Sequence, residues 1–300
     1  MNRNIRTDLA VEAHEIWREE AGETTLLSGV EAKDEVIDGF KVTTVRILDE
    51  SGEKALQKPR GSYITLELDS LLHREENSFE NACKLLSDKL RELLRLEDTS
   101  SVLVVGLGNR DITPDAIGPE TVDCVMVTRH LKDQMPETFA PFRRVSAMCS
   151  GVLGTTGMES GDIIKAVCSV SFPSAVVAVD ALASRDTGKL CRTVQIADSG
   201  IVPGSGVGNA RQALSRDTLG VPVIAIGVPT VVDAGTLASQ LARSSGVELE
   251  PGALDGGADM FVTPRNIDKN VKDISKLIGY SLNLALHPGL SIEDVDMFLS

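Results

Sequence analysis

The sequence predicts an α/β fold: a mostly parallel central sheet with helices on both faces, and a small β-rich elaboration near the N-terminus. Apolar, β-branched runs recur from residue 101 onward, and amphipathic helical patterns alternate with them. Strands that are apolar on both faces and alternate with helices are typical of a parallel sheet covered on both sides. No fixed-period repeat or low-complexity linker divides the chain, so we predict one α/β domain.

The N-terminal part of the chain predicts a helix, two strands and a second helix. Apolar residues share one face of the first helix, over residues 7–21, at helical spacing: Leu9, Ala13, Ile16 and Trp17. Two β-rich runs, 41–48 and 61–68, flank a turn-prone segment and predict a small sheet beside the main core, within an elaboration over 25–70. Residues 77–96 form the second amphipathic pattern.

The rest of the chain predicts the core. Five apolar runs predict strands over residues 101–108, 143–149, 174–182, 193–198 and 221–232. Three helical patterns cover residues 119–131, 160–171 and 266–287. In the last of these, six residues form one apolar stripe: Ile267, Val271, Ile274, Ile278, Leu282 and Leu286.

Composition excludes several classes of function. The formal net charge of -14 disfavours direct binding to nucleic acid or to anionic membranes. No apolar run approaches the roughly 18 to 20 residues that span a bilayer, and the polar N-terminus lacks a secretory core, so we expect a cytoplasmic protein. The five cysteines show no C-x-x-C pair, which favours buried thiols over zinc or disulfides.

Two glycine loops fail the known phosphate-binding patterns. Gly106 and Gly108 begin a dinucleotide-like pattern, but Asp111 stands where the third glycine belongs. The run "GSGVGN" fails in the same way at Asn209, and no P-loop, G-x-S-x-G elbow or H-E-x-x-H motif occurs. A phosphorylase-like module whose glycine loops hold an anion therefore stays only as an alternative.

Aspartates follow two of the predicted core strands. Asp115 comes shortly after the run at 101–108, and Asp180 closes the apolar run "SAVVAVD". Ligands of open parallel sheets collect at the carboxyl ends of the strands, where these acids would converge. The alternative is that such aspartates cap helices or fix turns, which we favour for Asp111 and leave open for Asp115.

Five long motifs, in order, resemble germination proteases of spore-forming bacteria: "GLGNRDITPDAIGP", "SAVVAVDALASR", "IADSGIVPGSGVGNAR", "IGVPTVVDAGTL" and "FVTPRNIDKNVKDISKLIGYSLNLALHPGL". The resemblance covers nearly the whole chain. It implies an atypical aspartic endopeptidase that starts the degradation of small acid-soluble spore proteins, with a fold related to that of hydrogenase-maturation proteases. It also implies a homotetramer.

The resemblance assigns roles to particular residues. Asp115 and Asp180 would form the catalytic pair, and Gly106, Gly108 and Asn109 would form the supporting loop. The maturation proteases hold a metal with acidic and histidine side chains, and we find no matching histidine here. We therefore predict no metal and no cofactor, with a metal-dependent endopeptidase of the same fold as the alternative.

The resemblance also implies that the protein is made as a zymogen. Family members cut between an acidic and a bulky apolar residue, within Thr, acid, apolar residue, Ala; the sequence Thr7-Asp8-Leu9-Ala10 matches this pattern. Self-cleavage between Asp8 and Leu9 would release residues 1–8 and leave 9–300 as the peptidase domain. The plainer interpretation, that Thr7 and Asp8 cap the first helix, is compatible with this.

An acidic enzyme that cuts after an acidic residue needs a local group that attracts the carboxylate. Three basic residues fall near the predicted edge of the sheet: Arg129, Lys132 and Arg185. Exposed basic side chains are common on any protein surface, so a solvated role is the alternative for each.

Overall fold

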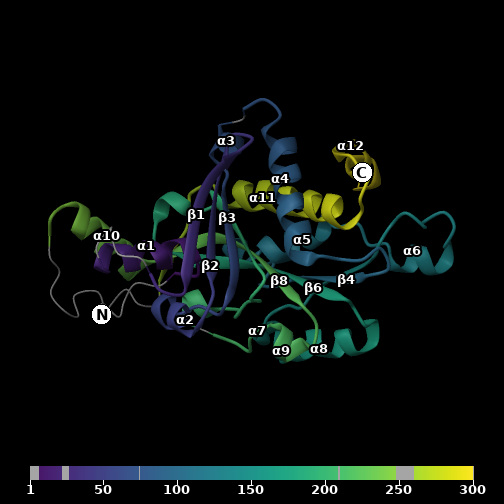
Figure 1. Ribbon diagram of the computed structural model, residues 1–300, viewed down its shortest axis with the longest axis horizontal. Helices are drawn as coiled ribbons and strands as arrows, with labels where there is room; N and C mark the ends of the chain where they lie inside the picture. The colour runs from purple at the N-terminus through teal and green to yellow at the C-terminus, as the bar shows by residue number, and fades with distance from the viewer. Residues whose placement is uncertain (1–6, 22–26, 74, 209, 248–259, 300) are drawn as a thin grey trace.

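The computed structural model describes residues 7–21, 27–73, 75–208, 210–247 and 260–299. In this part of the chain, nine strands form one sheet in the order β1-β2-β3-β7-β8-β6-β4-β5, and β9 pairs with β8 (Figure 1). The strands are β1 (Val30–Ile37), β2 (Phe40–Ile47), β3 (Gly61–Glu67), β4 (Ser101–Gly106), β5 (Arg144–Cys149), β6 (Ala175–Ser184), β7 (Thr193–Ala197), β8 (Val223–Asp233) and β9 (Phe261–Val262).

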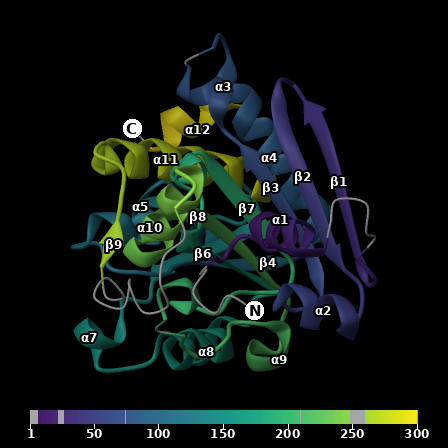
Figure 2. The same ribbon diagram turned by 90° about the vertical axis from the view of Figure 1, so that its left-hand side faces the viewer.

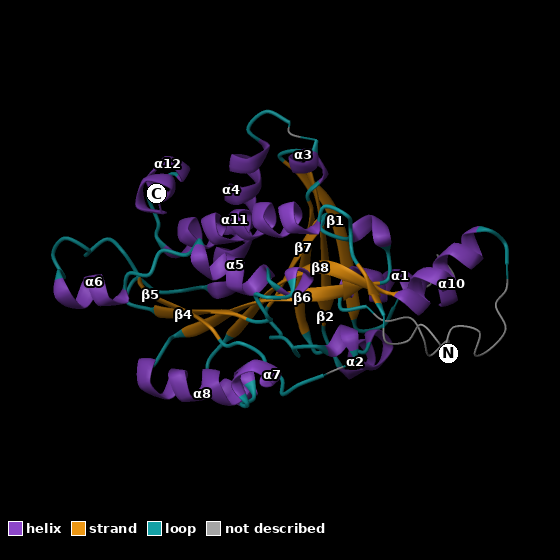
Figure 3. Ribbon diagram, turned by 180° about the vertical axis from the view of Figure 1, so that it is seen from behind, coloured by secondary structure: helices purple, strands orange, loops and turns teal. Residues whose placement is uncertain are grey.

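Helices cover both faces of the sheet, as predicted. Their bounds are α1 (Ala10–Ala21), α2 (Glu50–Leu56), α3 (Asp69–Leu72), α4 (Ser78–Leu94), α5 (Ile117–Asp123), α6 (Arg129–Gln134), α7 (Leu153–Thr156), α8 (Ser160–Ser171), α9 (Arg216–Leu219), α10 (Ala234–Ser244), α11 (Ile267–Leu286) and α12 (Ile292–Leu299). Figure 3 shows α4, α5 and α11 above the strands, and α7 and α8 below them.

The largest core lies between the sheet and the layer of α4, α5 and α11. The apolar stripe predicted for residues 266–287 is buried there along α11, from Ile267 to Leu286. A smaller core packs the opposite face against α8, with Ile164 and Cys168 beneath β4 and β6. The central strands are therefore apolar on both faces because each face meets a helix layer.

The expectation of a mostly parallel sheet is wrong. Among the described strands, β4 pairs in parallel with β5 and β6, and β6 with β8. The remaining pairings are antiparallel: β1 with β2, β2 with β3, β3 with β7, β7 with β8, and β8 with β9. Burial on both faces is typical of parallel strands, but it does not fix the direction of a strand: β7 is buried on both faces and yet pairs antiparallel with β3 and β8.

The β-rich elaboration is part of the main sheet, whereas a small separate sheet was expected. β3 pairs with β7 over Tyr63–Glu67, which continues the sheet from the core to β1 (Figure 2). The expected strands at 41–48 and 61–68 are present as β2 and β3. α2 replaces most of the turn expected between them, because Asp49 caps its N-terminus by accepting the N–H groups of Ser51 and Gly52.

The helix expected over 119–131 is broken into α5 and α6. Between them, the Met126 N–H donates to Asn283 Oδ1 at 2.9 Å, and the Thr128 N–H donates to the Val145 carbonyl at 3.0 Å. These partners from α11 and β5 replace the carbonyls that a continuous helix would have offered.

Candidate active site

The first candidate acid lies on the loop that follows β4. The chain leaves β4 at Gly106 and reaches the short 3-10 helix η1 (Thr113–Asp115) before α5. A Cβ on Gly106 would lie 2.4 Å from the Gly118 carbonyl oxygen, and one on Gly118 would lie 2.3 Å from the Leu107 carbonyl oxygen. Only glycine permits so close an approach, so α5 begins directly against the end of β4.

The loop backbone orients Asp115, which is half-buried. Its Oδ2 accepts the Asn109 N–H at 2.7 Å. Gly108 has φ +100°, and a Cβ there would lie 2.1 Å from the Asp115 carbonyl oxygen. Burial raises the pKa of the Asp115 carboxyl, and the Asn109 N–H partly offsets this. Gly108 and Asn109 therefore act as the support of Asp115.

The second candidate acid, Asp180, lies within β6 and is only 5% exposed. It stands opposite Gly227 of β8, and its Oδ1 accepts the Ala181 N–H at 3.0 Å. Burial raises the pKa of Asp180 well above its usual value, and the charges of Asp115 and Asp8 raise it further. The Ala181 N–H acts in the opposite direction. The environment therefore favours the protonated form of Asp180.

The structure brings Asp115 and Asp180 together where β4 ends. Asp180 does not close its strand, as the apolar run suggested, because β6 continues to Ser184, and Asp180 directly follows Val179, the partner of the last β4 residue, Gly106. η1 contacts both β6 and β8, and the charge of Asp115 is the largest effect on the pKa of Asp180 after burial. Asp111 is separate: it is exposed, and its N–H donates to Asn109 Oδ1 at 3.0 Å, as expected for a turn residue. Two nearby carboxyl groups in unlike environments can hold one proton between them.

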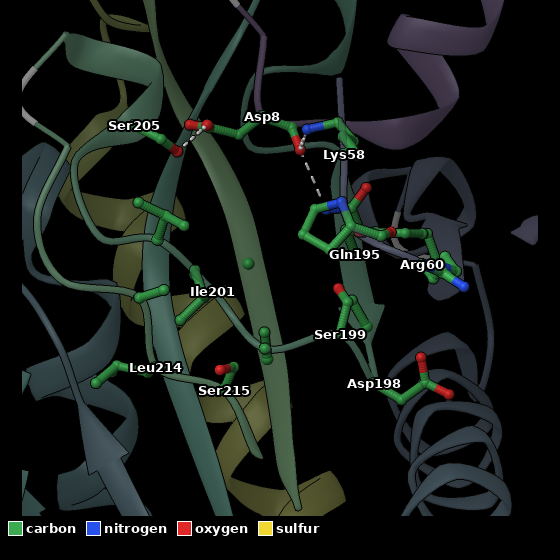
Figure 4. Close-up of a pocket in the computed structure, with 18 of the residues that line it drawn as sticks. Asp8, Lys58, Arg60, Gln195, Asp198, Ser199, Ile201, Ser205, Leu214 and Ser215 are labelled. Atoms are coloured by element: carbon green, nitrogen blue, oxygen red, sulfur yellow. Dashed lines mark hydrogen bonds between the residues drawn. The ribbon is translucent and has the colours of Figure 1, made fainter. Parts of the chain in front are cut away.

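Asp8 is bound at the same side of β6. Its N–H donates to the Ala183 carbonyl at 2.9 Å, and its Oδ2 accepts the Ala183 N–H at 2.9 Å. Its Oδ1 accepts the Ser205 hydroxyl at 2.7 Å. Its carbonyl oxygen accepts Lys58 Nζ at 2.8 Å and Gln195 Nε2 at 3.4 Å (Figure 4). Both the side chain and the carbonyl of Asp8 are therefore held by hydrogen bonds.

The start of α1 is fastened to the turn after β6. Thr7 Oγ1 accepts the Leu9 N–H at 3.0 Å, which forms a turn before α1, and it donates to Glu12. The expected capping of α1 by Thr7 and Asp8 is wrong, because the Ala10 N–H donates to Gln195 Oε1 and the Asp8 carboxylate accepts from Ala183 and Ser205. The Glu12 side chain is fully buried and also accepts the Ser184 hydroxyl at 2.6 Å and the Arg185 N–H at 2.9 Å. Residues 1–6 of the predicted propeptide lie outside the described residues.

A cavity of about 650 Å³ extends from Asp8 between β7 and the segment after it. Figure 4 shows Asp8, Lys58 and Ser205 at one end, and Asp198 and Ser215 toward the other. Sequence reasoning missed Lys58 and Gln195 entirely, because neither lies in a recognisable motif. Ser205 lies in the run "GSGVGN", which fails the phosphate-loop pattern and falls within one of the family motifs, but neither pattern assigns the serine a role.

The three basic residues proposed to attract an acidic side chain have other partners. Arg129 donates to the Ser171 carbonyl at 2.7 Å, and Lys132 donates to the Ala140 carbonyl at 3.0 Å. Arg185 forms an ion pair with Glu19 at 2.6 Å. The Asp8 carboxylate instead accepts hydrogen bonds from two uncharged donors, the Ala183 N–H and the Ser205 hydroxyl.

The described residues contain no group of three or more His, Cys, Asp or Glu side chains placed to hold a metal ion. No helix among them is long and apolar enough to cross a membrane.

The chain is similar to known proteins over most of its length. The family model described as "Germination protease" matches residues 10–243. A germination protease of Caldanaerobacter subterraneus subsp. tengcongensis is 43% identical over 98% of this chain and 98% of its own length. Those of Clostridium tetani and Bacillus pumilus are 42% and 35% identical, over 99% and 98% of this chain and 100% and 96% of their own lengths.

Among solved structures, a nickel–iron hydrogenase maturation protease from Thermococcus kodakarensis matches with a TM-score of 0.35 and 17% identity, covering 65% of this chain and 98% of that one.

Proposed function

The chain belongs to the germination protease family, and from this premise we propose that it is a self-processing aspartic endopeptidase that cuts small acid-soluble spore proteins. The family supports a protease that acts in spores. The convergence of Asp115 and Asp180 beside the end of β4 is the observation that carries the aspartic mechanism. Residues 1–8 are the propeptide in this proposal, and a cytoplasmic homotetramer of the remainder is the active form.

The unlike environments of the two acids divide their roles. Asp180 is the more deeply buried and keeps a proton, while the Asn109 N–H favours the ionised form of Asp115. Asp115 therefore accepts a proton from water as the water oxygen bonds to the carbonyl carbon. Asp180 donates its proton to the leaving nitrogen as the C–N bond breaks, and a proton then returns from Asp115 to Asp180. Each such role typically contributes about 10²- to 10⁴-fold to the rate.

The bound position of Asp8 supports self-processing. The bond proposed to be cut follows Asp8, whose side chain is held by β6 and whose carbonyl is held by Lys58 and by Gln195 of β7. Leu9 is buried against Leu182, which places the apolar residue after the cut in an apolar site. The surroundings of the acid, the bulky apolar residue and Ala10 thus match the order of residues in the proposed cleavage pattern.

Asn substitution of each acid tests the proposal, because Asn has nearly the same shape and cannot take the proton. We expect D115N and D180N to lose both the release of residues 1–8 and the cleavage of a small acid-soluble spore protein, followed by mass spectrometry. D111N is the matched control on the same loop and should keep wild-type activity. Turnover in D115N or D180N would reject the aspartic pair. Loss of wild-type activity with a chelator, restored by one divalent ion, would favour the metal-dependent alternative.

A further inference from the structure

Both oxygens of the Asp8 carboxylate meet a donor of fixed position. The Ala183 N–H donates to Oδ2 at 2.9 Å, and the Ser205 hydroxyl donates to Oδ1 at 2.7 Å. A Cβ on Gly206 would lie 1.9 Å from Oδ2, so a glycine is needed there for the carboxylate to fit. The Asp8 N–H also donates to the Ala183 carbonyl at 2.9 Å. The residue is therefore held by backbone pairing and by its side chain together, as an extended peptide is when it adds to a strand.

The carbonyl of Asp8 is held from the opposite side. Lys58 Nζ lies 2.8 Å and Gln195 Nε2 lies 3.4 Å from its oxygen. Gln195 Oε1 also accepts the Ala10 N–H at 2.7 Å, so one side chain spans the peptide groups on both sides of Leu9. Negative charge develops on a carbonyl oxygen when water attacks the carbon, and a donor or a cation placed there stabilises the transition state.

The sheet register relates this contact to the catalytic acids. Gly227 of β8 pairs with Asp180 on one side and with Gln195 of β7 on the other. Paired residues of neighbouring strands project to the same face, and two strand spacings amount to about 10 Å. Gly227 leaves no side chain of its own in the row between Asp180 and Gln195. The Leu182 side chain covers Gly227, since a Cβ there would lie 2.3 Å from Leu182 Cδ1. The acid and the amide therefore lie on one face of the sheet, on either side of Leu182, against which Leu9 packs.

We propose that Ser205, the Ala183 N–H and Lys58 form the subsite for the acidic residue that precedes the cleaved bond. Asp8 occupies it before processing, and an acidic residue of the substrate occupies it afterwards. Ser205 and Ala183 bind the side-chain carboxylate, and Lys58 binds the carbonyl oxygen of the bond to be cut. This inference rests on the proposed function, and it assigns recognition of the acid to uncharged donors.

The contact with the side chain is tested with paired peptides that differ only in Glu or Gln before a Leu-Ala sequence. A hydrogen bond to a charged group is worth roughly 10- to 100-fold in binding. We expect S205A in the processed enzyme to raise KM for the Glu peptide by that factor and to leave the Gln peptide nearly unchanged. S169A, an exposed serine on α8, is the control and should keep the wild-type ratio of kcat/KM values.

The contact with the carbonyl predicts a different pattern. Because every peptide has this carbonyl, K58M should lower kcat/KM for the Glu and Gln peptides alike, by about 10²- to 10³-fold. K58R keeps the charge and should recover part of the loss. A thermal melt of each variant shows that the fold is retained.

A double-mutant cycle in the full-length chain tests direct contact before processing. If Asp8 and Ser205 interact, the rate of release of residues 1–8 in D8N/S205A should fall by less than the product of the two single effects. Strictly multiplicative effects, or an unchanged Glu-to-Gln ratio in S205A, would overturn the subsite even with D115N and D180N inactive. If D180N stayed active, the proposed function would fail, whereas a lost Glu preference in S205A would still support the subsite.

Discussion

The parallel and the antiparallel half of the sheet carry different residues of the candidate site. In the parallel half, formed by β5, β4, β6 and β8, the strands β4, β6 and β8 are buried on both faces, and Asp180 lies within β6. In the antiparallel half, formed by β1, β2, β3 and β7, the edge strand β1 is largely exposed, and a tight turn at Asp38 and Gly39 joins it to β2. Asp115 and Asp180 belong to the parallel half, whereas Gln195 and the nearby Lys58 belong to the antiparallel half.

The difference follows from how the two kinds of half are connected. Parallel strands need crossovers, so their carboxyl ends open into loops that can be shaped by glycine contacts, as at Gly106 and Gly118. In the antiparallel half β1 turns directly into β2, and the residues of β7 are fixed by ladders to both β3 and β8. Asp115 is therefore carried by a loop, whose position can be adjusted, whereas the Gln195 amide is carried by a strand that is fixed in the sheet.

The largest expected effect compares one glycine from each half. G108A would place a Cβ 2.1 Å from the Asp115 carbonyl oxygen at φ +100°, whereas G39A in the β1–β2 turn has φ +85° and its nearest neighbour at 3.8 Å. We expect G108A to lose about 100-fold in kcat/KM, because small displacements of a catalytic group are costly. G39A should cost about 1 kcal/mol in urea unfolding and leave activity intact. Normal activity in G108A would contradict the supporting role of this loop.

The next effect concerns α1, which packs over the antiparallel half and is fastened to the end of β6. Glu12 is fully buried, and E12A would leave the Ser184 hydroxyl and the Arg185 N–H without their acceptor. We expect a loss of about 3 kcal/mol in the free energy of unfolding. E15A, which removes the partly exposed partner of Lys189, should cost less than about 1 kcal/mol. Equal losses of unfolding free energy in E12A and E15A would show that Glu12 does not hold α1 to the end of β6.

The smallest effect is a difference in pH dependence between the halves. Because the folded-state pKa of Asp180 is raised, its contribution to stability is complete below the unfolded pKa and is lost as pH rises through the folded pKa. The pKa of Asp49 is lowered by the Ser51 hydroxyl and the Gly52 N–H, so its contribution is present at higher pH and lost on acidification.

Melting curves measured against pH separate these two signs. D180N should flatten the decline in Tm that begins as the pH rises above the unfolded pKa of an aspartate, by about 2–4 °C for each kcal/mol that it removes. D49N should flatten the decline on acidification. If D180N kept the wild-type slope as the pH rises, Asp180 would not be the group that loses its proton there.

Much of the fold was predictable because it depends on burial. The stripe from Ile267 to Leu286 gave α11 nearly to the residue, and the apolar runs gave the core strands. β1 was missed because its residues are mostly exposed and show no apolar face. The turn at Asp38 and Gly39, both with positive φ, carried the Asp-Gly hairpin signal that could have revealed it.

The candidate site divides in the same way. Asp115 and Asp180 follow apolar runs and occur in long motifs, so they could be named from sequence. Lys58, Gln195 and Ser205 meet at Asp8 only because β7 pairs with both β3 and β8. That pairing is set by tertiary structure between distant segments, and no local pattern reports it.

The ladder between β3 and β7 has a consequence for any shortened form of the protein. A chain trimmed of its first seventy residues would lose β1, β2 and β3, and Thr193–Ala197 would become the outer strand of the sheet. Its bare N–H and C=O groups would then be a template for strands of other molecules. Such a fragment should aggregate, so the N-terminal strands keep the enzyme soluble as well as framing its cleft.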